Sequence, residues 1–214
     1  MQQRDVPTDP PTAGRTDPPG GGVAAQKARW RRRLTSARRD RPADERGTAD
    51  VALRDRVLDL PELTGVRTLA AYVSLATEPP TGRLLTALLG AGLEILVPVV
   101  QPDLDLDWTV YRGEHEMQAG PLGIGEPTGP RLGLDAVSRA DLVVVPALAV
   151  DREGHRLGKG AGCYDRALAH ARPYVRLVAL VFDDELVESL PYARHDRDVD
   201  LVVTPRRTVR LRGL

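Results

Sequence analysis

The sequence predicts an α/β protein with a mainly parallel sheet that is covered by helices on both faces. After Pro61, short apolar runs alternate with segments of helical periodicity. Some of these runs are nearly continuous Val and Leu, such as "DLVVVPALAV" at 141–150, which is typical of strands buried on both faces. A chain of 214 residues is long enough for one such core, so we expect a single domain.

The N-terminal part predicts a tail followed by two helices. Residues 1–22 are rich in Pro, Gly, Thr and Asp, so we expect a disordered tail ahead of a domain at 23–214. Residues 23–41 have helical periodicity, which Pro42 ends, and a second helix is expected over 43–60. The apolar stripe of the first helix consists of Trp30, Leu34 and Ala37.

The rest of the chain alternates between strands and helices. The expected strands are 68–75, 93–100, 106–112, 141–150, 175–183 and 199–205. The expected helices are 81–92 and 163–171. Ligands of parallel sheets bind at the carboxyl ends of the strands, so the loops after these strands should share one functional edge. These loops follow Leu75, Val100, Val150, Phe182 and Val203.

Composition limits the classes of function. The formal net charge is zero, which gives no general attraction to nucleic acid or to anionic membranes. The single cysteine, Cys163, excludes an internal disulfide and a multi-cysteine metal site. No apolar run approaches the roughly 20 residues that span a bilayer, and the N-terminus lacks the apolar core of a signal peptide. We therefore expect a cytoplasmic protein.

The segment "DREGHRLGKGAGCYDRAL" at 151–168 predicts a phosphate-binding loop. Its alternating glycines Gly158, Gly160 and Gly162 permit positive φ and close backbone approach, and successive N–H groups can form an anion nest. Arg156, Lys159 and the start of the following helix add positive charge. The spacing is neither that of a Walker A loop nor that of a dinucleotide fingerprint. The alternative is a plain glycine-rich turn between a strand and a helix.

Two carboxylates are candidates for a metal site. Asp165 lies in the first turn of the helix after the glycine loop, where it is either a Mg²⁺ ligand beside bound phosphate or an acid that only complements the helix dipole. Asp196 precedes the last strand, and its position relative to the loop does not follow from the sequence alone. The four histidines have no metal-ligand spacing, and Cys163 has no evident partner base.

The first helix carries eight basic residues and one acidic residue between Gln26 and Arg41. Helical periodicity places Lys27 and Arg31 together beside the apolar stripe, where a nearby anion would relieve their repulsion. The other arginines are expected to form a solvated face. A nucleic-acid-binding helix is the alternative, which the zero net charge disfavours.

Two further loops are candidates for ligand contact. Glu78 in "SLATEPPT" follows a predicted strand and can accept hydrogen bonds from a polar ligand, or it is an ordinary loop acid. The loop "GPLGIGEPTGP" at 120–130 either covers a flat ligand or only connects two elements.

Taken in order, these motifs resemble the 5-formyltetrahydrofolate cyclo-ligase family, also called methenyltetrahydrofolate synthetase. The glycine loop is similar to the family pattern R-L-G-x-G-x-G-Y-Y-D. The K-x-x-x-R of Lys27 and Arg31 precedes it, as do "SLATEPPT" and "GPLGIGEP", and "HDRDVDLVVTP" follows it. The resemblance covers roughly residues 24–205. It implies a Rossmann-like three-layer α/β/α fold and the conversion of 5-formyltetrahydrofolate and ATP to 5,10-methenyltetrahydrofolate, ADP and phosphate, with Mg²⁺.

The resemblance also implies roles for individual residues. ATP would be bound by Lys27, Arg31, Arg156, Leu157, Gly158, Lys159, Gly160, Ala161, Gly162, Cys163 and Tyr164. Of these, Lys27, Arg156 and Lys159 would be catalytic, while Asp165 and Asp196 would hold Mg²⁺. The reduced folate would contact Val73, Glu78 and Leu122. No nucleic-acid or membrane partner is implied, and a monomer or weak dimer is expected.

Three positions depart from the family pattern, because Cys163, Val150 and Leu122 stand where aromatic residues are common. These departures affect stacking contacts and leave the phosphate-binding groups intact. They motivate an alternative, a nucleotide- and folate-binding paralogue of the same fold whose activity is lost or altered.

Overall fold

The computed structural model describes residues 22–120, 125–193 and 196–211. Residues 1–21 of the expected tail and the candidate folate contact Leu122 lie outside this part of the chain. None of the described helices is long and apolar enough to cross a membrane.

A seven-stranded sheet forms the centre of the fold, in the order β12-β11-β9-β6-β1-β2-β3. The inner strands β11, β9, β6, β1 and β2 pair in parallel, and the outermost strands β3 and β12 pair antiparallel to their neighbours. The prediction of a mainly parallel sheet is therefore confirmed. The strands are β1 Thr68–Ala71, β2 Glu94–Val100, β3 Leu106–Val110, β6 Leu142–Pro146, β9 Arg176–Leu180, β11 Leu201–Val203 and β12 Thr208–Arg210.

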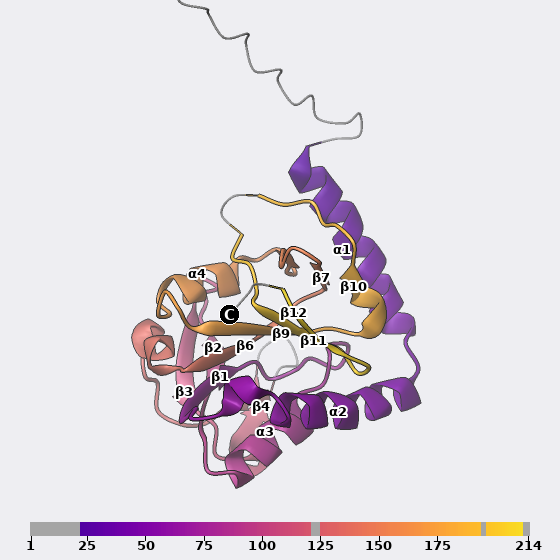
Figure 1. The fold of residues 1–214 in the computed structure, drawn as a ribbon. Helices are drawn as coiled ribbons and strands as arrows, with labels where there is room; N and C mark the ends of the chain where they lie inside the picture. The colour runs from indigo at the N-terminus through magenta and orange to yellow at the C-terminus, as the bar shows by residue number, and fades with distance from the viewer. Residues whose placement is uncertain (1–21, 121–124, 194–195, 212–214) are drawn as a thin grey trace, which may run out of the picture.

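Helices cover both faces of this sheet and confirm the three-layer arrangement (Figure 1). On one face, α2 (Ala43–Leu58) and α3 (Gly82–Gly90) bury Leu53, Leu84 and Leu88 against the strands. On the other, α4 (Cys163–Ala169) and the 3-10 helix η4 (Leu134–Arg139) bury Leu168 and Val137. Both α2 and α3 end two residues earlier than the sequence predicts.

The remaining described elements are short. They are the 3-10 helices η1 Pro61–Leu63, η2 Glu114–Glu116 and η5 Asp183–Glu185, and the hairpin strands β4 Met117–Ala119 and β5 Gly125–Pro127. A second sheet contains β7 Ala149–Asp151, β8 Arg156–Leu157 and β10 Leu186–Val187, in the order β10-β7-β8. The sequence patterns did not predict β4, β5, β8 or β10, and they placed β7 at the end of the strand expected over 141–150.

The prediction of one continuous strand over 141–150 is wrong. The chain leaves the main sheet at Pro146, which has no N–H to donate to a neighbouring strand, and β7 then pairs within the second sheet. The strand expected over 68–75 likewise ends at Ala71. Beyond it, the Thr81 hydroxyl donates to the Tyr72 carbonyl at 3.0 Å, which replaces a strand hydrogen bond with a side-chain one.

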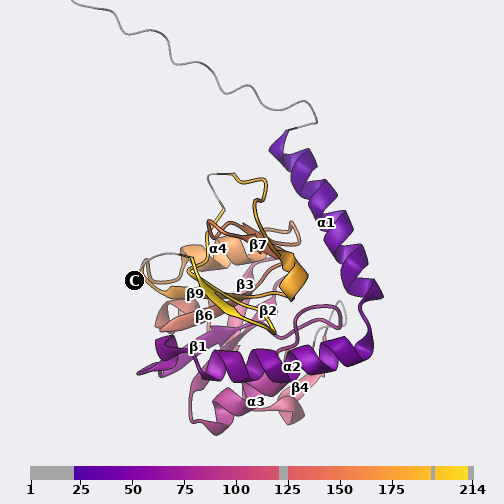
Figure 2. The ribbon, with the colours of Figure 1, turned by 45° about the vertical axis from the view of Figure 1, so that its right-hand side comes forward.

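Helix α1 (Val23–Asp40) stands along one side of the molecule, past β7 and β10 (Figure 2). Its buried apolar residue Leu34 packs against Leu148, Ala149, Leu157 and Leu190 of the region around the second sheet. Two expectations for this helix are wrong, because Ala37 is exposed while Arg38 is buried. The apolar cluster beneath α1 is small, so polar contacts contribute much of its attachment.

The order of the strands places a topological switch point between β1 and β6. The chain continues from β1 through α3 to β2 on one side of β1, whereas β6 and the following β9 lie on the other side. Ligands of open α/β sheets bind at the carboxyl ends of the strands at such a point. The loop after β1 contains Glu78, and the segment after β6 leads to the glycine loop.

Candidate active site

The glycine loop, residues 158–162, connects β8 to α4. Gly160 and Gly162 have φ values of 107° and 72°, in the left-handed region that side chains rarely adopt. A Cβ at Gly160 would lie 3.1 Å from Arg31 Cζ, so glycine here also lets the Arg31 guanidinium approach the backbone. The positive φ therefore favours glycine at this position, and a Cβ here would also displace the Arg31 side chain slightly.

The loop after β1 and the glycine loop meet through a charged pair. Lys159 Nζ lies 2.7 Å from Glu78 Oε1, and Glu78 is buried whereas Lys159 is about half exposed. The other carboxylate oxygen of Glu78 accepts a hydrogen bond from the Leu75 N–H at 2.9 Å, which fixes its orientation. Two motifs that are 80 residues apart thus share one location at the switch point.

Helix α1 brings two cations to the same location. Arg31 Nε donates to the Gly158 carbonyl at 2.9 Å, and Lys27 Nζ donates to Asp196. The expectation that these two residues face the domain is confirmed. Asp196 also accepts the Ala193 N–H at 2.8 Å, so the segment before the last parallel strand lies against α1.

Each candidate metal ligand has a cation beside it. Arg156 Nη2 donates to Asp165 Oδ1 at 2.5 Å, just as Lys27 donates to Asp196. Asp165 is about one-third exposed. Among the described residues, no group of three His, Cys, Asp or Glu side chains gathers as a metal site. A cation here would therefore need oxygen ligands from a bound anion in addition to these carboxylates.

Two tyrosines lie near Glu78 and remain neutral. Burial raises the pKa of Tyr164 far above that of a free phenol, and the negative charge of Glu78 raises it further. Burial and then Glu78 likewise raise the pKa of Tyr72, whose hydroxyl donates to the Pro79 carbonyl at 2.7 Å. The Tyr164 hydroxyl is buried without a hydrogen-bond partner among the described residues. It therefore lacks the hydrogen bond that a buried hydroxyl ordinarily makes.

Replacing Tyr164 by phenylalanine is expected to leave the melting temperature unchanged or to raise it. The substitution removes a buried hydroxyl that lacks a partner, and such a group costs free energy in the folded state. Differential scanning fluorimetry of the wild type and Tyr164→Phe measures this. A decrease of more than about 4 °C would mean that the hydroxyl has a stabilising partner in the free protein.

The other candidate residues have varied environments. Val73 is half-buried beside the core under α2 and α3, Cys163 is half-buried against the core under α4, and Leu157 is buried under α1. Ala161 is exposed, and its carbonyl accepts Arg166 Nη1 at 3.1 Å.

A cavity of about 340 Å³ lies between α1, the loop after β1 and the glycine loop. It is lined by Arg31, Thr35, Arg38, Arg39, Thr77, Leu148 and Lys159. Four of these side chains are cationic and none of the lining side chains is acidic. Glu185 and Glu78 pair with two of the cations, Arg38 and Lys159, so an anionic group in the cavity would be attracted mainly by Arg31 and Arg39. Thr35, Arg38, Arg39 and Thr77 are not among the sequence-predicted site residues. For Arg38 a signal exists, since it lies seven residues after Arg31 and hence on the same helix face.

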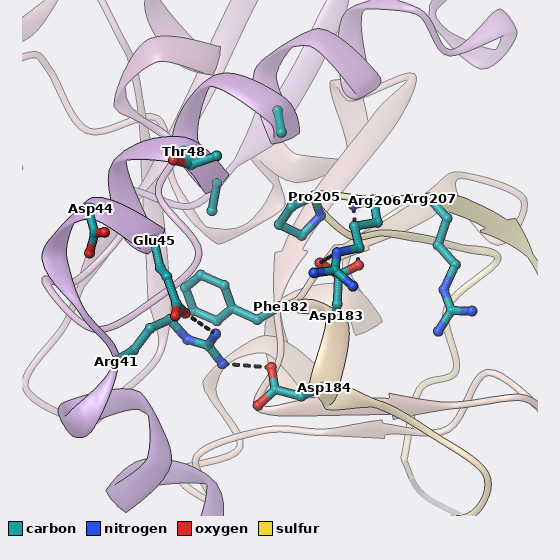
Figure 3. A pocket seen from close by; sticks show the side chains of 12 residues that line it. Arg41, Asp44, Glu45, Thr48, Phe182, Asp183, Asp184, Pro205, Arg206 and Arg207 are labelled. Atoms are coloured by element: carbon teal, nitrogen blue, oxygen red, sulfur yellow. Dashed lines mark hydrogen bonds and ion pairs between the residues drawn. The ribbon is translucent and has the colours of Figure 1, made fainter.

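A larger cavity of about 850 Å³ lies at the junction of α1 and α2 (Figure 3). Its charged side chains neutralise one another, because Arg41 contacts Asp184 at 2.6 Å and Glu45 at 3.2 Å while it stacks over Phe182. None of the sequence-predicted site residues lines it. Size alone therefore does not identify the functional site.

The comparisons with known proteins identify the family of the chain. Residues 23–205 match the 5-formyltetrahydrofolate cyclo-ligase family. The chain belongs to this family. The resemblance on which the sequence analysis rests is thereby confirmed, as is the prediction that the protein is an enzyme of this family.

Curated relatives and a solved structure extend this family assignment. A 5-formyltetrahydrofolate cyclo-ligase of Mycolicibacterium smegmatis is 40% identical over 188 residues, which cover 86% of this chain and 95% of that protein. The enzyme of Escherichia coli K12 is 32% identical over 155 residues, 71% of this chain and 85% of that protein. The solved 5,10-methenyltetrahydrofolate synthetase of Aquifex aeolicus has a TM-score of 0.76 and 27% identity, covering 87% of this chain and 93% of that one.

Proposed function

We propose that this protein converts 5-formyltetrahydrofolate and ATP to 5,10-methenyltetrahydrofolate, ADP and phosphate. The observation that carries the proposal is the contact of Lys159 with Glu78, which unites a phosphate-binding loop with a buried hydrogen-bond acceptor. A reaction between a polyphosphate and a polar heterocycle requires that the groups that bind the two substrates lie side by side. The family of the chain and the names of its relatives support the same substrates.

The glycine loop and α1 are proposed to bind the ATP phosphates. Four cations contact carboxylates or a carbonyl in the structure, and a polyphosphate would replace those acceptors. These cations are Lys27, Arg31, Arg156 and Lys159. The backbone N–H groups of residues 158–162 add donors without Cβ obstruction. Phosphoryl transfer depends mainly on positioning and charge neutralisation, which these groups can supply.

The loop after β1 is proposed to bind the reduced folate. Glu78 is buried and held by the Leu75 N–H, so its free acceptor capacity has a fixed direction. It would accept hydrogen bonds from the N–H groups of the pterin once Lys159 turns to phosphate. Val73 would contribute an apolar contact, and Leu122 keeps the folate-contacting role that the resemblance implies.

The proposed reaction has two bond-forming steps. The oxygen of the formyl group on N5 attacks the γ-phosphorus of ATP. The bond between the γ-phosphorus and the oxygen that bridges it to the β-phosphate breaks, and ADP leaves. The lone pair of N10 then attacks the activated formyl carbon, N10 loses its proton, and the carbon–oxygen bond breaks to release phosphate. Lys159, Lys27 and Arg156 would stabilise the negative charge that shifts to the phosphate oxygens.

Asp165 and Asp196 are proposed to hold Mg²⁺ together with phosphate oxygens. The donor set fits this ion, which commonly takes one or two carboxylates plus oxygens of a bound phosphate. When bound, Mg²⁺ would neutralise phosphate charge. Arg156 and Lys27 donate to these two carboxylates in the structure and would turn to the phosphate oxygens when the carboxylates hold the metal ion.

The direct test is to incubate purified protein with 5-formyltetrahydrofolate, ATP and Mg²⁺ and to follow the near-ultraviolet absorbance of the methenyl product. We expect product only when both substrates are present, and none after chelation of the metal. Absence of ATP-dependent product at micromolar enzyme would contradict the proposal. Binding of both ligands without product would instead favour the paralogue with lost activity, which the replaced aromatic positions Cys163, Val150 and Leu122 motivate.

A further inference from the structure

A buried ion pair connects the C-terminal half of α1 to the segment after β9. Arg38 Nε donates to Glu185 Oε1 at 2.6 Å and Arg38 Nη2 donates to Glu185 Oε2 at 2.8 Å, and both side chains are 2% exposed. Burial opposes the charge of Arg38, but hydrogen bonding and attraction to Glu185 outweigh it, so the pKa of Arg38 is raised. The pair is therefore charged and bidentate in the interior.

The same two side chains reach the ends of two central strands. Arg38 Nη2 also donates to the carbonyl of Ala147, which directly follows β6, at 2.5 Å. Glu185 Oε2 accepts the N–H of Phe182, two residues after the end of β9, at 2.9 Å. The guanidinium thus holds α1 against the carboxyl ends of adjacent strands, at the edge where the candidate site lies.

Arg38 lies on the same face of α1 as the two candidate phosphate ligands. Lys27, Arg31 and Arg38 are separated by four and seven residues, which places Arg38 about 10 Å along the axis from Arg31. Ligand binding would require Lys27 and Arg31 to give up Asp196 and the Gly158 carbonyl. The contacts of Arg38 are independent of that exchange. Together with Leu34, the buried apolar residue of α1, the pair attaches the helix to the rest of the domain through buried contacts.

We propose that Arg38 and Glu185 form a positioning pair that sets α1 relative to the glycine loop, so that Lys27 and Arg31 reach the ATP phosphates. The inference rests on the proposed function. Arg38 also lines the cationic cavity, whereas Glu185 is not among the lining residues. A Glu185 variant therefore tests whether the pair acts on ATP binding through the position of α1, because Glu185 itself does not line the cavity, whereas Arg38 could also contact the ligand directly.

The test uses the single variants Arg38→Met and Glu185→Met and the double variant that combines them. Removing one partner leaves an uncompensated buried charge and should lower the melting temperature, whereas replacing both with apolar side chains often restores stability. Binding of a non-hydrolysable ATP analogue with Mg²⁺ is measured by isothermal titration calorimetry. Arg33→Met, an exposed cation on the same helix, is the matched control.

We expect the double variant to melt at a higher temperature than either single variant but to bind the analogue at least about tenfold more weakly than the wild type, because small misplacements of binding groups are costly. Glu185→Met should weaken binding similarly, and Arg33→Met should not. Wild-type affinity in the folded double variant would overturn the inference while leaving the proposed function intact. A wild-type protein that binds no analogue would contradict the proposed function and the inference with it.

Discussion

Replacing Lys159 by methionine is expected to lower kcat/KM for ATP by about 10²- to 10³-fold, the typical cost of removing one group that stabilises transition-state charge. Lys159 is about half exposed, and among the ion pairs of the described residues it contacts only Glu78, whose buried carboxylate keeps the Leu75 N–H as a hydrogen-bond donor after the change. Steady-state assays of methenyl product at varied ATP measure the effect, and circular dichroism checks that the fold is retained.

Arg152→Met provides the matched control for Lys159. Arg152 is an exposed cation between β7 and β8 that pairs with the exposed Glu188 at 2.9 Å and is not among the proposed phosphate-binding residues. Its replacement should leave kcat/KM within about twofold, since surface ion pairs contribute little. If Lys159→Met and Arg152→Met behaved alike, Lys159 would have no specific role in the phosphate-binding half of the site.

Replacing Glu78 by glutamine is expected to raise KM for 5-formyltetrahydrofolate by about 10- to 100-fold, the range for hydrogen bonds to a charged group. Glutamine has nearly the same shape but presents an N–H donor where one carboxylate oxygen had accepted. KM for ATP should change little, because the phosphate-binding cations remain. Initial rates over a matrix of both substrate concentrations separate the two constants.

Glu188→Gln is the control for this second substitution, since Glu188 is an exposed acid that pairs with the exposed Arg152 and makes no contact with Glu78 among the ion pairs of the described residues. It should leave both KM values at wild-type levels. An increase of KM for ATP alone in Glu78→Gln would assign Glu78 to the nucleotide, through Lys159, and would remove the structural support for a folate site in the loop after β1.

Much of the fold was predictable because buried strands and covering helices leave periodic patterns. The run at 93–100 and the helix from Val23 have nearly the predicted bounds. The prediction for 141–150 was wrong because the apolar run was taken as continuous, although Pro146, which lacks an N–H, indicates where the chain leaves the main sheet. A hydropathy pattern indicates that a strand is buried, but it does not indicate to which of two sheets the strand belongs.

The sequence predicted which residues belong to the candidate site, but it did not predict which of them form ion pairs with one another. The spacing of Lys27 and Arg31 predicted their shared direction, but the contact of Lys27 with Asp196 joins residues 169 positions apart. Arg38 was assigned to the solvated face because a cation is rarely buried, and its partner Glu185 is distant in the sequence. Long-range charge pairs of this kind depend on the assembled fold.

The central claim is that the glycine loop and Glu78 form a single site in which ATP is consumed to close the folate ring. The most direct test is to quantify ADP and methenyl product in the same single-turnover reaction. We predict one ADP for each methenyl product, with both yields falling together in Lys159→Met and Glu78→Gln. ADP formation at an unchanged rate without the folate, or methenyl product without ADP, would contradict the claim.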